Sequence, residues 1–176
     1  MGTDCRRAGI YDRWMVLPVP ASDRTALVTG ASSGIGVELA RELAGRGHGV
    51  TLVARRVDRL AELAEELSAT GVRAEVMSAD LADADAREAL PERVDALGLK
   101  VDILVNNAGV STFGPVDGSS PEAELAMIEL DVMAVADLTT RFLPGMVRRR
   151  SGAVLNVAST AAFQPLPGQA GYGACK

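Results

Sequence analysis

Three side chains near the carboxyl end could move a proton to or from a substrate oxygen. Tyr172 and Lys176 form a Y-x-x-x-K pattern, and residues four apart share one face of a helix, so the phenol and the ammonium would lie side by side. A free phenol ionises only near about pH 10, and a nearby cation makes the phenolate easier to form. Ser159 follows an apolar run that ends at Ala158. The group has the chemistry of a general acid or base assisted by a hydrogen-bond donor, although a buried serine and a surface Tyr/Lys pair are the plain alternative.

A glycine-rich turn near the amino end could hold a pyrophosphate. Residues 29–36 read T-G-A-S-S-G-I-G, between an apolar run at 26–28 and an amphipathic helical pattern over 34–46. Gly30, Gly34 and Gly36 let the backbone turn tightly, and the helix that follows points free N–H groups and the positive end of its dipole at an anion. A strand, a glycine turn and a helix in this order are typical of a dinucleotide site.

The next predicted strand, 49–54, is followed by Arg55 and Arg56. A site for NAD needs a carboxylate here, which accepts hydrogen bonds from the ribose 2′-hydroxyl. Ala54 stands at that place, and a guanidinium instead suits a 2′-phosphate. The sequence therefore favours NADP(H) over NAD(H), although two arginines that open a helix could also be plain surface charge.

Strand-like and helical patterns alternate along the rest of the chain. Near-continuous apolar strands between amphipathic helices predict an α/β protein with a Rossmann-type doubly wound parallel sheet, of which about five strands are present and the carboxyl end is incomplete. Residues 1–22 are expected to form a flexible amino-terminal extension, and residues 23–176 the dinucleotide-binding domain. Further helices are expected over 56–69, 83–97 and 121–149, and further strands over 72–78, 101–105 and 153–158.

The composition excludes several function classes. The net charge is −5, which argues against nucleic acid as a partner because a phosphate backbone rewards a basic face. No apolar run approaches the roughly 20 residues of a membrane span. Cys5 and Cys175 lie at opposite ends without metal-ligand spacing, so no metal and a reduced, cytoplasmic setting are expected. The basic run 148–150 is expected to be a solvated helix end, where cations are favoured by the helix dipole.

Taken together, these motifs resemble the short-chain dehydrogenase/reductase family over residues 25–176. The resemblance rests on the Gly-x3-Gly-x-Gly spacing, on the N-N-A-G sequence at 106–109, and on Ser159, Tyr172 and Lys176. It implies an NADP(H)-dependent oxidoreductase that interconverts a small-molecule carbonyl and an alcohol by hydride transfer. Tyr172 would exchange the proton with the substrate oxygen, Ser159 would hydrogen-bond that oxygen, and Lys176 would bind the nicotinamide ribose. The cofactor-binding residues would be Gly30, Ser32, Ser33, Gly34, Ile35, Gly36, Arg55, Arg56, Asp80, Leu81, Asn107, Ala108, Gly109, Tyr172 and Lys176.

Two features depart from the family pattern. Asp131 stands where the family usually has an asparagine that joins a water relay to the lysine, and a carboxylate there could pair with Lys176 or disturb the relay. Family members also continue through further strands and a loop that closes over the substrate. We therefore expect the chain of 176 residues to be a fragment or natural truncation that is inactive by itself. The alternative function is a non-catalytic dinucleotide-binding remnant. The full-length form is expected to be a homo-oligomer, and the substrate is not specified by these residues.

Overall fold

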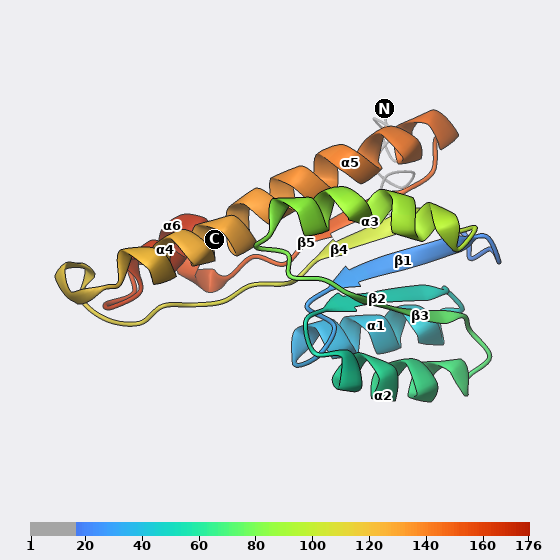
Figure 1. The fold of residues 1–176 in the computed structure, drawn as a ribbon, viewed down its shortest axis with the longest axis horizontal. Coiled ribbons are helices and arrows are strands. Elements are labelled where there is room, and N and C mark those ends of the chain that lie inside the picture. Colours follow the sequence, from blue (N-terminus) through green and yellow to red (C-terminus); the bar gives the residue numbers. More distant parts are fainter. Residues whose placement is uncertain (1–16) are drawn as a thin grey trace, which may run out of the picture.

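Five parallel strands form one twisted sheet in the order β3-β2-β1-β4-β5 (Figure 1). The computed structural model describes residues 17–176, and every strand pairing in it is parallel. This is the doubly wound order that the alternating pattern predicted, with the crossovers on both sides of β1. The strands are β1 (Arg24–Thr29), β2 (Val50–Ala54), β3 (Ala74–Ser78), β4 (Lys100–Asn106) and β5 (Ala153–Asn156).

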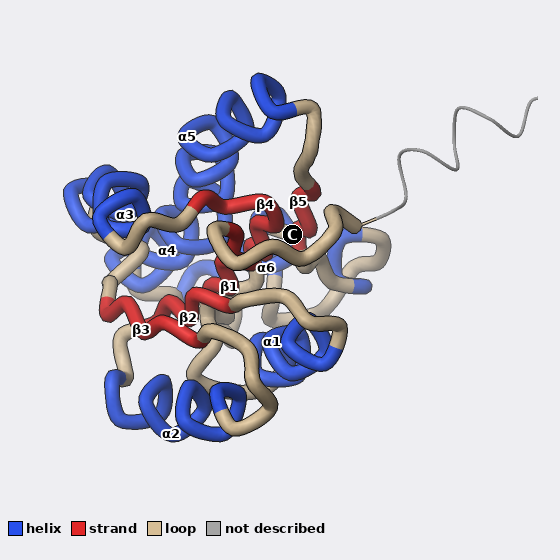
Figure 2. The backbone as a smooth tube through the Cα atoms, turned by 90° about the vertical axis from the view of Figure 1, so that its right-hand side faces the viewer, coloured by secondary structure: helices blue, strands red, loops and turns tan. Residues whose placement is uncertain are grey.

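Helices cover both faces of the sheet, as Figure 2 shows end-on. On one face lie α1 (Ile35–Gly45) and α2 (Val57–Ser68), and on the other lie α3 (Ala84–Ala96) and α5 (Ala134–Arg149). A short α6 (Ala170–Cys175) follows β5, after the 3-10 turn η3 (Thr160–Ala162). A second 3-10 turn, η1 (Val116–Gly118), lies in the loop after β4.

The helix predicted over 121–149 is divided. It consists of α4 (Pro121–Ile128), a π-helical turn η2 (Glu129–Met133), and then α5. Ser120 caps α4 by accepting a hydrogen bond from the Ala123 amide, with Pro121 at the first helical position. A π turn widens the helix by one residue, and such turns are frequent at functional sites. Apolar periodicity does not reveal this turn.

Two apolar cores result from the strands being buried on both faces. Neighbouring strand residues point to opposite faces, so Val28 packs toward α1 and α2 while Leu27 packs toward α3 and α5. Leu52 and Val53 divide in the same way, and all four side chains are completely buried. Burying one such side chain contributes about 1.5–3 kcal/mol, which explains why the central strands read as continuous apolar runs.

The predicted extension over 1–22 falls mainly on residues 1–16, which lie outside the described residues, as does Cys5. Within its last part, Leu17 packs against the core on the α1 side of the sheet. Across residues 17–176, no helix is both long and apolar enough to cross a membrane.

The carboxyl end of α5 is not simply solvated, and that expectation is wrong for Arg149. Its guanidinium donates to the Val101 carbonyl at 2.7 Å and to Asp102 Oδ1 at 2.9 Å. Asp102 is buried and also accepts from Arg24 at 3.1 Å. Arg149 therefore joins the end of α5 to the beginnings of β4 and β1.

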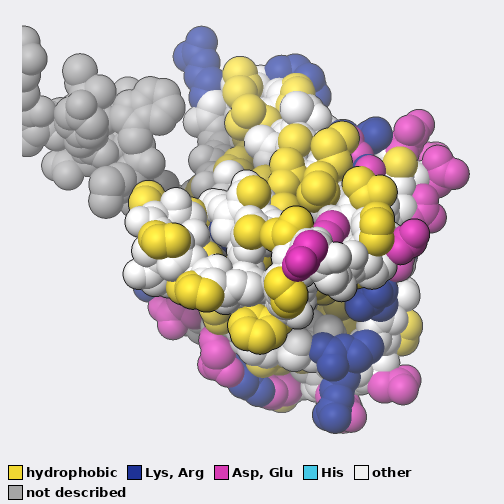
Figure 3. All heavy atoms as spheres, turned by 90° about the vertical axis from the view of Figure 1, so that its left-hand side faces the viewer, with side chains coloured by type: hydrophobic (Ala, Val, Ile, Leu, Met, Phe, Trp, Pro, Cys, Tyr) yellow, Lys and Arg dark blue, Asp and Glu magenta, His cyan; other side chains and the backbone are white. Residues whose placement is uncertain are grey.

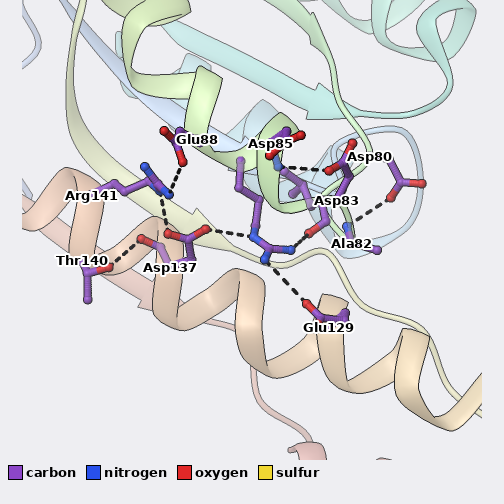
Figure 4. A network of polar contacts seen from close by, with 11 residues as sticks. Asp80, Ala82, Asp83, Asp85, Glu88, Glu129, Asp137, Thr140 and Arg141 are labelled. Atoms are coloured by element: carbon purple, nitrogen blue, oxygen red, sulfur yellow. Dashed lines mark hydrogen bonds and ion pairs between the residues drawn. The ribbon is translucent and has the colours of Figure 1, made fainter.

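A buried guanidinium joins α3 to the divided helix (Figure 4). The side chain of Arg87 is 5% exposed; it donates to Asp137 Oδ2 at 2.9 Å and lies 3.6 Å from Glu129 Oε2. It also donates to the Leu81 carbonyl at 2.7 Å. Burial raises the pKa of Asp137, but hydrogen bonds from Arg87 and Arg141 outweigh it and lower that pKa overall. One side chain thus ties the loop after β3, the π turn and α5 together.

Replacing Arg87 by methionine keeps the bulk and removes the charge. We expect Arg87→Met to lower the free energy of unfolding by about 3 kcal/mol, the lower end of the range for breaking a buried pair, because Asp137 keeps Arg141. Urea unfolding measures this. The control is Arg59→Met on α2, where the side chain is 64% exposed and a change within about 0.5 kcal/mol is expected. Equal losses in the two variants would contradict the role given to Arg87.

The lowered pKa of Asp137 also predicts an acid dependence. Its ionised form is stabilised by folding, so its share of stability is present above the unfolded pKa of about 3.9 and is lost as the pH falls through the lower folded value. Asp137→Asn should therefore flatten the fall in stability below about pH 4. Asp117→Asn, at an exposed position in η1, should leave the acid limb unchanged, and an unchanged limb in Asp137→Asn would refute the assignment.

Candidate active site

The loops after β1 and β4 are held against each other at the carboxyl edge of the sheet. Thr29 Oγ1 accepts from the amides of Asn107 and Ala108 at 2.9 and 3.0 Å, and it donates to the Val105 carbonyl. Asn107 Nδ2 donates to the Thr29 carbonyl. Gly30 has φ +66°, and a Cβ there would lie 2.8 Å from Ala108 Cα. Only glycine fits this turn, for conformational and for steric reasons.

Helix α1 begins directly against the same turn. A Cβ on Gly36 would lie 2.5 Å from both the Gly30 carbonyl oxygen and Asn107 Nδ2. Gly34, at the N-cap with φ 59°, offers no side chain to cap the helix. The first N–H groups of α1 therefore lack a side-chain partner, which is the arrangement that binds anions at helix N-termini.

Beside this turn lies a cleft of about 280 Å³. The predicted cofactor residues that line it are Gly30, Ser32, Ser33, Arg55, Arg56, Asp80, Leu81, Ala108 and Gly109. Of the other predicted residues, Gly34 and Gly36 shape the turn, Ile35 is 62% exposed, and the amide of Asn107 is used to hold the two loops together.

The cleft has four further lining residues that sequence reasoning did not assign to the cofactor site. Ala54 and Ala79 lie at the ends of β2 and β3, Val110 follows Gly109, and Leu130 comes from the π turn. The first three could have been found from strand ends, since ligands bind at the carboxyl edge of parallel sheets. Leu130 could not, because its approach to the cleft depends on how η2 packs.

The two arginines after β2 differ in their surroundings. Arg56 donates to Ser32 Oγ at 3.0 Å and to Ser33 Oγ at 2.7 Å. Arg55 lies 3.8 Å from Asp80 Oδ2, with its side chain 68% exposed. Among residues 17–176, no carboxylate pairs with Arg56. Neutral hydroxyls orient its guanidinium over the glycine turn and leave its positive charge uncompensated at the rim of the cleft.

The predicted catalytic side chains lie on two short elements that pack together. Ser159 caps η3, and its Oγ accepts from the Ala161 amide at 3.1 Å. Helix α6 lies against this turn, since a Cβ on Gly173 would come within 3.3 Å of the Ala161 carbonyl oxygen. Tyr172 lies on α6 and Lys176 is the residue that caps its end one turn later, with Lys176 Nζ 5.7 Å from the centre of the Tyr172 ring. The Tyr172 ring and the Lys176 ammonium therefore lie near each other, as the spacing predicted.

Asp131 pairs with Lys176, which was one of the two outcomes left open above. Its Oδ2 lies 3.0 Å from Lys176 Nζ, and its side chain is completely buried. A Cβ on Gly109 would meet the Asp131 carboxylate at 2.9 Å and Lys176 Nζ at 3.0 Å. Because Gly109 lines the cleft, the ammonium of Lys176 lies directly beside the candidate cofactor site.

Comparison with known proteins agrees with this geometry. The family model of the short chain dehydrogenases matches residues 24–176. A short chain dehydrogenase of Pseudocercospora fijiensis is 39% identical over 155 residues, covering 87% of this chain and 50% of the relative. The very-long-chain 3-oxoacyl-CoA reductase of Anas platyrhynchos is 37% identical, covering 89% of this chain and 52% of the relative.

Solved structures show the same likeness in three dimensions. A metagenomic short-chain oxidoreductase crystallised with NADP superposes with a TM-score of 0.84 at 38% identity, covering 88% of this chain and 71% of that one. The chain spans about half the length of the two curated relatives. On the match over residues 24–176, the glycine turn and the shared fold, the chain belongs to the short-chain dehydrogenase family.

Proposed function

We propose that this chain carries the NADP(H) site and the proton-transfer group of an oxidoreductase that interconverts a carbonyl and an alcohol. The observation that carries the proposal is the position of Lys176. Its ammonium lies beside Gly109, which lines the cleft, and on the same helix as Tyr172. A dinucleotide site and an acid/base candidate thus meet at one edge of the sheet.

The cleft suits NADP(H) through the charge of Arg56. A guanidinium oriented by Ser32 and Ser33 and paired with no described carboxylate offers its donors to a phosphate. The end of β2 is the place where the 2′-position of the adenosine ribose is recognised in this fold. The Gly30 turn and the start of α1 would take the pyrophosphate, Asp80 and Leu81 would border the adenine, and Lys176 would take the nicotinamide ribose. The metagenomic relative with NADP supports this choice.

The residues at the edge of β5 have complementary roles in proton transfer. When bound, the nicotinamide supplies or accepts the hydride. Tyr172 would give its proton to a carbonyl oxygen during reduction and take it back during oxidation. Ser159 Oγ already accepts from the Ala161 amide, so its own hydroxyl proton stays available for the same substrate oxygen. The ammonium of Lys176, 5.7 Å from the centre of the Tyr172 ring, would place a positive charge beside the reacting phenol.

Exposed apolar side chains lie in the loop after β4 and directly after η3, and they favour a substrate with an apolar portion. Figure 3 shows hydrophobic side chains gathered on the face at the end of α4 and α6. Phe113 and Phe163 are 84% and 88% exposed. Phe113 lies close to Gly168, whose carbonyl accepts from the Gly114 amide at 2.8 Å. The loop after β4 and the segment before α6 therefore form one apolar rim.

A first test measures cofactor choice. NADPH should bind more tightly than NADH in a fluorescence titration, and Arg56→Ala should reduce the affinity for NADPH by about tenfold or more, because a hydrogen bond to a charged group is worth about 1.5–3 kcal/mol. Affinity for NADH should hardly change. Arg59→Ala on α2 is the control and should preserve the preference. Equal affinities for both cofactors in the unaltered chain would overturn the assignment.

A second test measures the acid/base group. In a chain extended by the family's carboxyl half, Tyr172→Phe keeps the ring and removes the proton, so turnover of an apolar ketone should fall by about 10²–10⁴-fold while the Kd for NADPH stays the same. Ser159→Ala should also lower kcat. The control is Ser68→Ala at an exposed position at the end of α2, which should have no effect.

The alternative is a dinucleotide-binding protein without catalysis. NADPH binding with no turnover of any ketone or alcohol, both in this chain and in one extended by the family's carboxyl half, would support it. Turnover that survives Tyr172→Phe would instead show that another group transfers the proton.

A further inference from the structure

One buried carboxylate faces two donors from different parts of the chain. Asp131 Oδ1 accepts from the Val110 amide at 2.8 Å, and Asp131 Oδ2 lies 3.0 Å from Lys176 Nζ. Val110 belongs to the loop that lines the cofactor cleft, and Lys176 follows α6. The side chain of Asp131 is completely buried and that of Lys176 is 11% exposed. Asp131 therefore bridges the cleft loop and the candidate catalytic lysine.

The π turn gives Asp131 this position. Within η2, Glu129 lies on the side of Arg87, whereas Asp131 lies on the side of Lys176. Space is tight there, because a Cβ on Gly109 would touch both members of the ion pair. Neither partner can move far without displacing the other.

The carboxylate is chemically matched to this place. It offers an acceptor to each donor, whereas an asparagine offers one acceptor and would turn its NH₂ group toward either the amide or the ammonium. Oδ2 has no hydrogen bond of good geometry, so the 3.0 Å contact with Lys176 Nζ is an ion pair, and it supplies the positive charge that a buried carboxylate requires.

We propose that Asp131 is a positioning residue: its carboxylate holds Lys176 against the cleft loop at Val110 and balances the charge that Lys176 presents to Tyr172. The consequence for catalysis rests on the function proposed above, but the ion pair itself does not. The other titratable groups beside the pair are Tyr172 and Cys175 on α6, and Cys175 in turn lies near Glu124 on α4. Burial first, and then the charges of Asp131 and Glu124, raise the pKa of the Cys175 thiol, so the charge of Asp131 is felt along α6.

Amine labelling tests the ion pair without requiring turnover. Lys100 and Lys176 are the only lysines of the chain, and Lys100 is 48% exposed, so it is an internal standard. Acetic anhydride labelling followed by peptide mass spectrometry should modify Lys176 more slowly than Lys100. In Asp131→Asn the rate at Lys176 should rise by about threefold or more, while the rate at Lys100 stays constant. Glu129→Gln removes the same charge from the same turn and should change neither rate.

A rate at Lys176 equal to that at Lys100 in the unaltered chain would overturn the proposal, as would an unchanged rate at Lys176 in a folded Asp131→Asn variant. Circular dichroism establishes whether the variant folds. If the variant does not fold, the proposal is tested by the ratio of the labelling rates at Lys176 and Lys100 in the unaltered chain. Where turnover is measurable, Asp131→Asn should alter the pH profile of turnover and leave the affinity for NADPH nearly unchanged, because it removes the negative charge that balances Lys176 beside Tyr172. A chain extended by the family's carboxyl half that binds NADPH without turnover would refute the proposed function and leave the labelling result standing.

Discussion

The close contact between the turn after β1 and the loop after β4 is the constraint on which the site depends. Thr29 satisfies two amides of the β4 loop with one hydroxyl, and Gly30 and Gly36 leave no room for a Cβ. Because both loops are fixed at this contact, α1 starts at a defined place, directly after the turn that lines the cleft. The same contact sets the position of Gly109, and through it the distance between the cleft and Lys176. A single methyl group at either glycine would separate these parts.

Three cations near the site have different partners, and the partners indicate their roles. Arg87 is buried between carboxylates and a carbonyl, which suits a fixed structural link. Arg56 is oriented by hydroxyls that leave its charge uncompensated, which suits binding of an anion from solution. Lys176 is paired with the buried carboxylate of Asp131 and lies close to the phenol of Tyr172. This arrangement suits a cation whose charge is partly neutralised beside a reacting group. Residue type alone does not separate these cases, because the balance depends on what each cation meets in space.

Most of the sheet and much of the cofactor site could be predicted, and the failures share one cause. Strands and glycine turns depend on local pattern, so β1, β2 and the turn between β1 and α1 were found within a few residues. The sequence did not predict that the long helix is divided at η2, nor that Arg149 pairs with Asp102. An apolar stripe reports which face of a helix is buried, but not that the helix gains an extra residue in one turn. A charged residue likewise does not reveal a buried partner that lies 47 positions away.

The sequence by itself determined the order of the elements, the glycine turn and the spacing of Tyr172 and Lys176, because each depends on neighbours within a turn or a strand. Tertiary structure alone decided that Asp131 meets Lys176, since the two residues are 45 positions apart with a β-strand between them. It also decided that Leu130 reaches the cleft and that Arg87 supports the π turn. These contacts join segments distant in the chain, and their geometry follows from how the helices pack on the sheet. Long-range charge pairs therefore depend on tertiary packing, whereas backbone conformation and local spacing depend on the local sequence.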